Sequence, residues 1–255
     1  MRFSYDLAGA EPIIRDVPLY DASGIANGEL VMLGNTDPDS NADHGVAFQT
    51  AYESSQAASA VDALGVCQED ITCTTLPDVA TEAASYGKVI VNPFAVYLAE
   101  YSQAAADDVA LTQAWSTTTL TLTSLEDDID CGWVLGSSES ATSGFAGQLR
   151  WISASASGSC TLSTAPTTAG TTNDMIVKIL PVNHRLTSLN AGATGLLSQA
   201  AAGACVSLHI VENFIEADGL SFSPLRRYNH DGLDLTNARA YAAIVMLDHV
   251  YKIGD

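Results

Sequence analysis

The chain has 255 residues, of which 47% are hydrophobic, and its 30 acidic against 10 basic residues give a formal net charge of -20. A chain of this length and hydrophobic content can fill a substantial core, so intrinsic disorder is not expected. Binding to nucleic acid or to an anionic membrane surface is disfavoured, because both depend on lysine and arginine side chains.

The N-terminal segment shows no export signal, because Asp6 interrupts the apolar run that a secretory signal needs. The longest apolar stretch, Ala240–Leu247, is far shorter than the roughly 20 residues of a membrane-spanning helix. We therefore expect a soluble protein that stays in the cytoplasm where it is made.

Strand-like segments dominate the chain. They are rich in β-branched or aromatic residues, and turn-forming residues separate them. The expected strands are 11–20, 29–33, 45–50, 88–95, 117–125, 132–135, 148–152, 160–162, 174–180, 205–211 and 241–253. The clearest helix candidate is the alanine-rich segment Ser54–Leu64. This spacing is typical of an all-β sandwich or barrel with few short helices.

A shift in composition near Leu76 makes residues 76–86 the best candidate boundary between two units. We expect a small N-terminal unit over residues 1–80 and a larger β-rich domain over residues 81–255. The small-residue run 153–172 has two interpretations, a flexible linker or a hairpin arm.

Two acidic clusters were considered as metal sites. Asp37–Asp43 places oxygen ligands at alternating positions, as a calcium loop does, but Ala42 and Phe48 stand where that loop needs glycine and glutamate. Glu126–Asp130 holds four acids that repel one another. We interpret both as solvated loops, the second with an inter-subunit contact as the alternative, and expect no metal site.

Catalytic signatures are missing from the sequence: there is no Gly-x-Ser-x-Gly, no Gly-x-x-x-x-Gly-Lys, no Gly-x-Gly-x-x-Gly and no His-Glu-x-x-His. The cysteines never form Cys-x-x-Cys, so we expect reduced, mostly buried thiols rather than a zinc site or a disulfide framework. They are Cys67, Cys73, Cys131, Cys160 and Cys205.

The histidines do not suggest a catalytic triad. His44, His230 and His249 each stand beside an aspartate, but adjacent side chains of a strand point to opposite faces and make poor dyads outside loops. His209 is interpreted as a strand histidine with a hydrogen-bond partner. We therefore expect no catalytic residue, no cofactor and no enzymatic activity.

The segment 212–239 mixes aromatic, basic and turn residues without a regular period. Arginine and tyrosine are enriched at protein interfaces, so Arg226, Arg227 and Tyr228 are the candidates for contacting an acidic neighbouring protein. A long ordered surface loop is an equal alternative.

Two regions resemble accessory proteins of tailed-bacteriophage heads. The first carries Gly28-Glu29-Leu30-Val31-Met32-Leu33, Gly45-Val46 and Ala63-Leu64-Gly65-Val66 in the order of the small tulip-like β-barrel of decoration (cement) proteins. The second carries Gly132-Trp133-Val134-Leu135-Gly136, Gly147-Gln148-Leu149-Arg150-Trp151-Ile152 and Met175–Pro181, which are similar to the hairpin-forming stretches of capsid-associated proteins. Together these cover about a third to a half of the chain.

The resemblance implies a mainly β fold, in which a small N-terminal β-barrel binds the capsid and a larger β-sandwich-like unit follows. It implies a non-enzymatic virion protein that assembles in the host cytoplasm, binds major capsid protein on the capsid exterior, often as a homotrimer, and stabilises the shell.

The alternative function is a β-rich carbohydrate-binding or glycan-hydrolysing protein. Trp115, Trp133 and Trp151 would then be stacking platforms, but we prefer them as core residues, because aromatic burial dominates β cores.

Overall fold

The structure, a computed structural model, describes most strands and their turns but not every connection. The described residues are 2–19, 21–33, 48–50, 63–73, 85–101, 109–110, 115–121, 132–137, 140, 142–156, 159–172, 174–180, 182, 185–186, 208–216, 223–225, 239–247 and 249. Within these ranges, no helix is long and apolar enough to cross a membrane.

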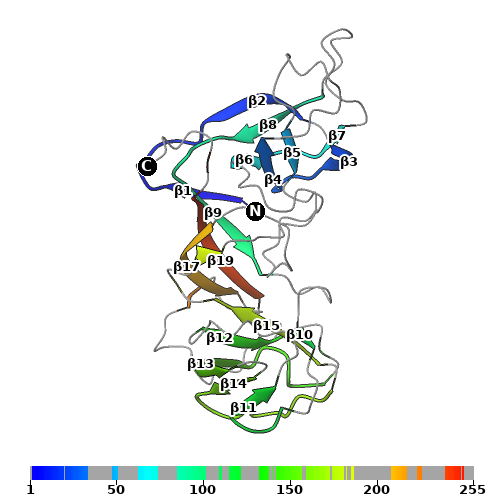
Figure 1. The fold of residues 1–255 in the computed structure, drawn as a ribbon, viewed down its shortest axis with the longest axis vertical. Helices are drawn as coiled ribbons and strands as arrows, with labels where there is room; N and C mark the ends of the chain where they lie inside the picture. The colour runs from blue at the N-terminus through cyan, green and yellow to red at the C-terminus, as the bar shows by residue number, and fades with distance from the viewer. Residues whose placement is uncertain are drawn as a thin grey trace. The chain divides into compact units, whose positions relative to one another are not determined.

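The described chain is mainly β, which confirms the expected fold class (Figure 1). The strands are β1 (Arg2–Asp6), β2 (Ile14–Leu19), β3 (Asp21–Ile25), β4 (Leu30–Leu33), β5 (Phe48–Thr50), β6 (Ala63–Cys67), β7 (Ile71–Cys73), β8 (Ser85–Ile90), β9 (Ala95–Glu100), β10 (Val109–Ala110), β11 (Thr119–Thr121), β12 (Trp133–Gly136), β13 (Leu149–Ala156), β14 (Ser159–Leu162), β15 (Met175–Ile179), β16 (Arg185–Leu186), β17 (Leu208–Glu216), β18 (Ser223–Pro224) and β19 (Arg239–Met246). No helix occurs among the described residues. The helix expected over Ser54–Leu64 lies outside them, apart from its last two residues, which begin β6.

The chain divides into two compact units. The first unit contains Met1–Ala99, Arg185–His209 and Ala243–Asp255, and the second unit contains Glu100–His184 and Ile210–Ala242. The expected boundary between residues 80 and 81 coincides with none of these limits. Separate folding of residues 1–80 and 81–255 stays a prediction.

A small barrel forms the N-terminal part of the first unit. Its strands follow the closed order β2-β5-β4-β6-β8, with β2 antiparallel to β8 over six residue pairs. The barrel core consists of Val17, Ile25, Val31, Leu64, Cys67, Val89 and Val91, with Ile71 packed against it. Because β8 pairs with both β2 and β6, the barrel needs residues up to Ile90, ten beyond the predicted unit.

A second sheet has the order β1-β9-β19-β17-β16, with β18 paired to β17. Residues Ala95–Ala99 of β9 are all buried, so both faces of this strand are covered, because successive side chains point to opposite faces. In the first unit, the Tyr97 hydroxyl donates a hydrogen bond of 3.2 Å to the Ile90 carbonyl, and the Tyr97 ring meets Phe3 edge to face. Burial raises the pKa of Tyr97, so this phenol stays protonated as a donor.

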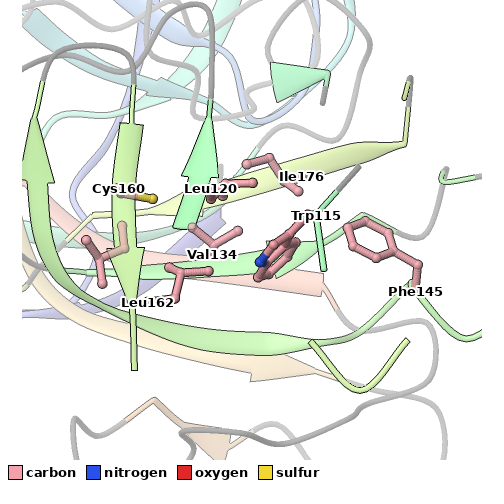
Figure 2. Packing of buried hydrophobic residues seen from close by; sticks show 8 residues of the cluster. Trp115, Leu120, Val134, Phe145, Cys160, Leu162 and Ile176 are labelled. Carbon is pink, nitrogen blue, oxygen red and sulfur yellow. The ribbon is translucent and has the colours of Figure 1, made fainter. Parts of the chain in front are cut away.

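A third sheet, of order β10-β15-β12-β13-β14-β11, lies in the second unit. One face carries the cluster shown in Figure 2, where Trp115 and Phe145 pack edge to face with ring centroids 5.6 Å apart. Neighbouring residues of a strand point to opposite faces of the sheet. On the face opposite this cluster, Trp133 and Trp151 form a cross-strand pair with ring centroids 4.7 Å apart. Both faces of the sheet are therefore apolar.

A buried arginine fixes a loop to this sheet. Arg150 is 1% exposed and donates to the Ala165 carbonyl at 3.1 Å and to Gln148 Oε1 at 3.2 Å. The same Gln148 oxygen accepts from the backbone N–H of Thr167 at 2.6 Å. These bonds satisfy a buried guanidinium, which would otherwise be very costly, and hold residues 165–168 against β13.

The observed strands confirm one prediction from the sequence and contradict another. The run 153–172 begins with the β13–β14 hairpin, so the hairpin interpretation is confirmed over residues 153–162. The single strand expected over residues 88–95 is wrong, because the chain turns at 91–94 and separates β8 from β9. The Asn92-Pro93 dipeptide is the turn signal at this point.

We expect Gly65→Ala to destabilise the barrel by roughly 2–4 kcal/mol. An added Cβ would lie 1.8 Å from the Ile90 carbonyl oxygen, where β6 passes β8, so the two strands would have to separate. Gly9→Ala is the control: nothing lies within 4 Å of its Cβ position, and its φ of +74° costs only about 1 kcal/mol. Urea unfolding would measure both variants, and equal losses would contradict the close approach of β6 and β8.

Candidate functional site

Most residues singled out from the sequence lie outside the described residues. These are Arg226, Arg227, Tyr228, His44, His184, His230, Asp37–Asp43 and Glu126–Asp130. Their proposed roles stay predictions. His209 lies in β17 opposite Arg185, which confirms it as a strand histidine.

The described residues contain no group of three or more histidine, cysteine or acidic side chains that could hold a metal ion. Cys67 and Cys160 are buried and free, and burial raises the pKa of the Cys160 thiol to about 11. This thiol is therefore protonated at neutral pH and behaves as a small apolar group.

The tryptophans are mostly inside the protein. Trp115 is 1% exposed and donates its indole N–H to the Thr117 carbonyl, and Trp133 is 3% exposed. Trp151 is half-buried against Trp133. Two of the three therefore have no face open for stacking on a sugar.

In the first unit, residues 7–13 link β1 to the barrel and residues 91–94 link the barrel to β9. A buried polar cluster joins these two links. We call it the Asn92 corner: residues 6–14 and 91–94. The Asn92 side chain donates to Asp6 Oδ2 at 3.1 Å and to the Glu11 carbonyl at 3.0 Å, and its oxygen accepts from the Ile13 N–H. Asn92 is 2% exposed and Asp6 is 8% exposed.

Further backbone bonds complete the Asn92 corner. Asp6 Oδ1 accepts from the Ala8 N–H at 2.8 Å, and the Leu7 N–H donates to the Phe94 carbonyl at 3.0 Å. The Val91 N–H donates to the Ile13 carbonyl at 2.9 Å. The two links are therefore bonded to each other at several points and present a defined surface.

This rigid corner carries an unusual set of exposed side chains. Leu7 is 55%, Ile13 43%, Ile14 50% and Phe94 47% exposed, and residues 7–16 are all exposed. Single exposed apolar residues are ordinary, but several large ones on segments tied together indicate an interaction surface.

The charges near the Asn92 corner are closer to balance than those of the strongly acidic chain as a whole, because Arg15 and Lys88 lie near the acids Asp6, Glu11 and Asp16. Arg15 and Glu11 are both exposed, and Arg15 makes no ion pair within the described part of the chain. Further along β2, Asp16 pairs weakly with Lys88 at 4.0 Å. Arginine with apolar neighbours is typical of protein interfaces.

Two other polar clusters contain titratable side chains with shifted pKa values. In the first, Asp174 accepts from the backbone N–H groups of Thr142 at 3.0 Å and Thr171 at 2.7 Å, and from the Thr171 hydroxyl at 3.1 Å. Burial raises the pKa of Asp174, but these hydrogen bonds outweigh it and hold the pKa below its usual value. The carboxylate therefore ties two loops together rather than moving protons.

The second cluster lies on β9, β19 and β17 within the second unit. Glu100 pairs with Arg239 at 3.6 Å, and the Tyr241 hydroxyl donates to Glu216 Oε2 at 2.9 Å. Burial and the neighbouring Glu216 raise the pKa of Tyr241 to about 12. This tyrosine is thus a fixed donor at neutral pH and not a nucleophile.

Comparisons of the chain with protein-family models, with characterised proteins and with solved structures found no match. The Asn92 corner is therefore the best-supported candidate site, on physical grounds alone. Sequence reasoning missed it, although Asn92-Pro93 and the apolar Ile13-Ile14 pair are its local signals.

We expect Asn92→Ala to lower the free energy of unfolding by about 2–3 kcal/mol, because Asp6 would keep a buried carboxylate without its amide donor. Amide hydrogen exchange of Ile13 should accelerate, since its acceptor is lost. Asn27→Ala is the control, because Asn27 is exposed. Unchanged exchange at Ile13 would show that Asn92 does not fix the corner.

Asp174 should make the second unit sensitive to acid. Its folded pKa lies below the ordinary value of 3.8, so its stabilisation is present at neutral pH and is lost as the pH falls below 3.8. Urea unfolding between pH 7 and pH 2.5 should show a flatter decline for Asp174→Asn than for the unmodified protein. Parallel declines would mean that these hydrogen bonds do not stabilise the carboxylate.

Proposed function

We propose that this chain is a virion structural protein: an accessory decoration (cement) protein that binds major capsid protein on the outside of a bacteriophage head and stabilises the shell. It acts without catalysis, cofactor or metal, and its work is done by folding and by packing against other protein subunits.

The observation that carries the proposal is the Asn92 corner, where four large apolar side chains are exposed on segments held by a buried hydrogen-bond cluster. A rigid surface loses little conformational entropy on binding, which favours protein docking. The resemblance of residues 28–33 and 63–66 to tulip-like barrels supports the choice of partner, and those residues contribute to β4 and β6 of a closed barrel.

The net charge of -20 supports a place on the outside of the shell, because an acidic protein does not adsorb the packaged nucleic acid. Repetition of one contact over a shell turns modest affinity into lasting attachment. The carbohydrate alternative loses support from the burial of Trp115 and Trp133, and the third tryptophan, Trp151, is half-buried against Trp133.

Arg226, Arg227 and Tyr228 remain the candidates for the contact with major capsid protein, and a homotrimer remains the proposed assembly. An arginine pair can form bidentate bonds with carboxylates of the shell.

Sedimentation of the full chain with undecorated phage capsids tests this function. We expect saturable, stoichiometric co-sedimentation, and at least about tenfold weaker binding for Arg226→Glu, because like charges would then face each other. Arg2→Glu is the control with the same change of net charge, because Arg2 is exposed in β1 and makes no ion pair within the described part of the chain. Failure to bind any capsid tried, with binding to glycans instead, would overturn the proposal.

A further inference from the structure

We propose that the Asn92 corner, with the adjoining Arg15, binds a second copy of this chain across a two-fold axis, so that Glu11 of each copy faces Arg15 of the other. The inference goes beyond the proposed function: it assigns the exposed surface of the corner to a second copy of the chain, and it leaves the contact with major capsid protein to Arg226, Arg227 and Tyr228.

The sequence of this segment is symmetric in charge about Ile13. Residues 11–15 read Glu-Pro-Ile-Ile-Arg, with opposite charges two positions either side of Ile13. When two such segments run antiparallel about Ile13, each Glu11 lies opposite an Arg15. In an extended chain residues 11, 13 and 15 share one face, so the two ion pairs flank an apolar centre.

A two-fold interface requires this kind of self-complementarity. In such an interface residue i of one copy contacts residue j of the other, and j contacts i in return. The segment provides both partners of each ion pair as well as the apolar contact between them.

The side chains of this segment are exposed and available for contact. Its backbone is fixed on one side, where Ile13 bonds to Asn92 and Val91, and Ile14 is paired with Ile90. The side chains of Glu11 and Arg15 are exposed and make no ion pair within the described part of the chain. The backbone of the segment is therefore held by hydrogen bonds, while the charged side chains of Glu11 and Arg15 remain available to pair with another molecule.

The charge of the whole chain restricts where two copies can meet. Two copies of charge -20 repel each other, so they can approach only where the local charge is balanced. The segment 11–15 has one acid and one base and meets this condition. An Arg15 without an ion pair also selects an acidic partner surface, and the Glu11 of a second copy supplies one.

The contact uses side chains rather than an added strand. Pro12 and Pro18 lack the backbone N–H that a continuous β ladder needs. Prolines at such positions prevent open-ended edge pairing, so the interface closes as a dimer instead of growing into a fibre. The proposed homotrimer would need a separate, three-fold contact.

Sedimentation velocity of the purified full chain, from about 1 μM to about 1 mM, tests the inference. We expect a reversible dimer. Glu11→Arg and Arg15→Glu, each alone, should weaken it by at least about tenfold, because like charges would then face each other. The double variant Glu11→Arg/Arg15→Glu should restore dimerisation to within about threefold of the unmodified chain.

The restoration makes the test specific. Both side chains are exposed, and the Glu11 group that binds Asn92 is its backbone carbonyl, so the exchanges leave the corner intact. Circular dichroism and thermal unfolding check this directly. A monomer over the whole range, single variants that dimerise normally, or a double variant that stays monomeric would each overturn the inference.

Capsid sedimentation of the same variants separates this inference from the proposed function. A chain that dimerises as expected but binds no capsid leaves the two-fold contact standing and overturns the decoration role. A monomeric chain whose capsid binding is lost in both single variants overturns the two-fold contact, and assigns the Asn92 corner to the shell instead.

Discussion

The hydrogen bonds of Asn92 are the constraint on which the first unit depends. The chain passes between β1 and the barrel at residues 7–13, and between the barrel and β9 at residues 91–94. The buried amide of Asn92 belongs to the second link and bonds to the first link and to Asp6 of β1, with partners 79 to 86 residues away in the sequence. An amide has two donors and an acceptor, so it can satisfy several buried backbone groups without introducing a charge. The exposed apolar side chains of the corner owe their fixed positions to it.

The second unit uses the same principle with charged side chains. Arg150 and Gln148 hold residues 165–168, and Asp174 holds the turns at Thr142 and Thr171. Both charged groups are almost fully buried and bonded mainly to backbone or hydroxyl groups. Within the described residues, these buried polar side chains therefore serve the architecture by joining loops to the sheet.

Much of the fold could be predicted from local pattern, but the candidate site could not. The strands β4, β12 and β15 follow short, mostly apolar runs, and their positions agree with the expected segments within a residue or two. The strand expected over residues 88–95 failed because hydrophobicity continues through Asn92-Pro93, where the backbone turns. The corner needs Asp6 and Asn92 to meet, and no local pattern records a contact between residues so far apart.

The sequence by itself determined the class of the fold, the absence of common catalytic motifs and the strongly acidic charge. These follow from residue type and from the alternation of side chains, which are properties of short segments. Tertiary structure alone decided that β8 closes the barrel, that Trp115 and Trp133 are inside, and that Leu7, Ile13, Ile14 and Phe94 lie on one bonded corner. Burial and exposure depend on which distant strands pair, and that pairing is chosen by the free energy of the whole chain.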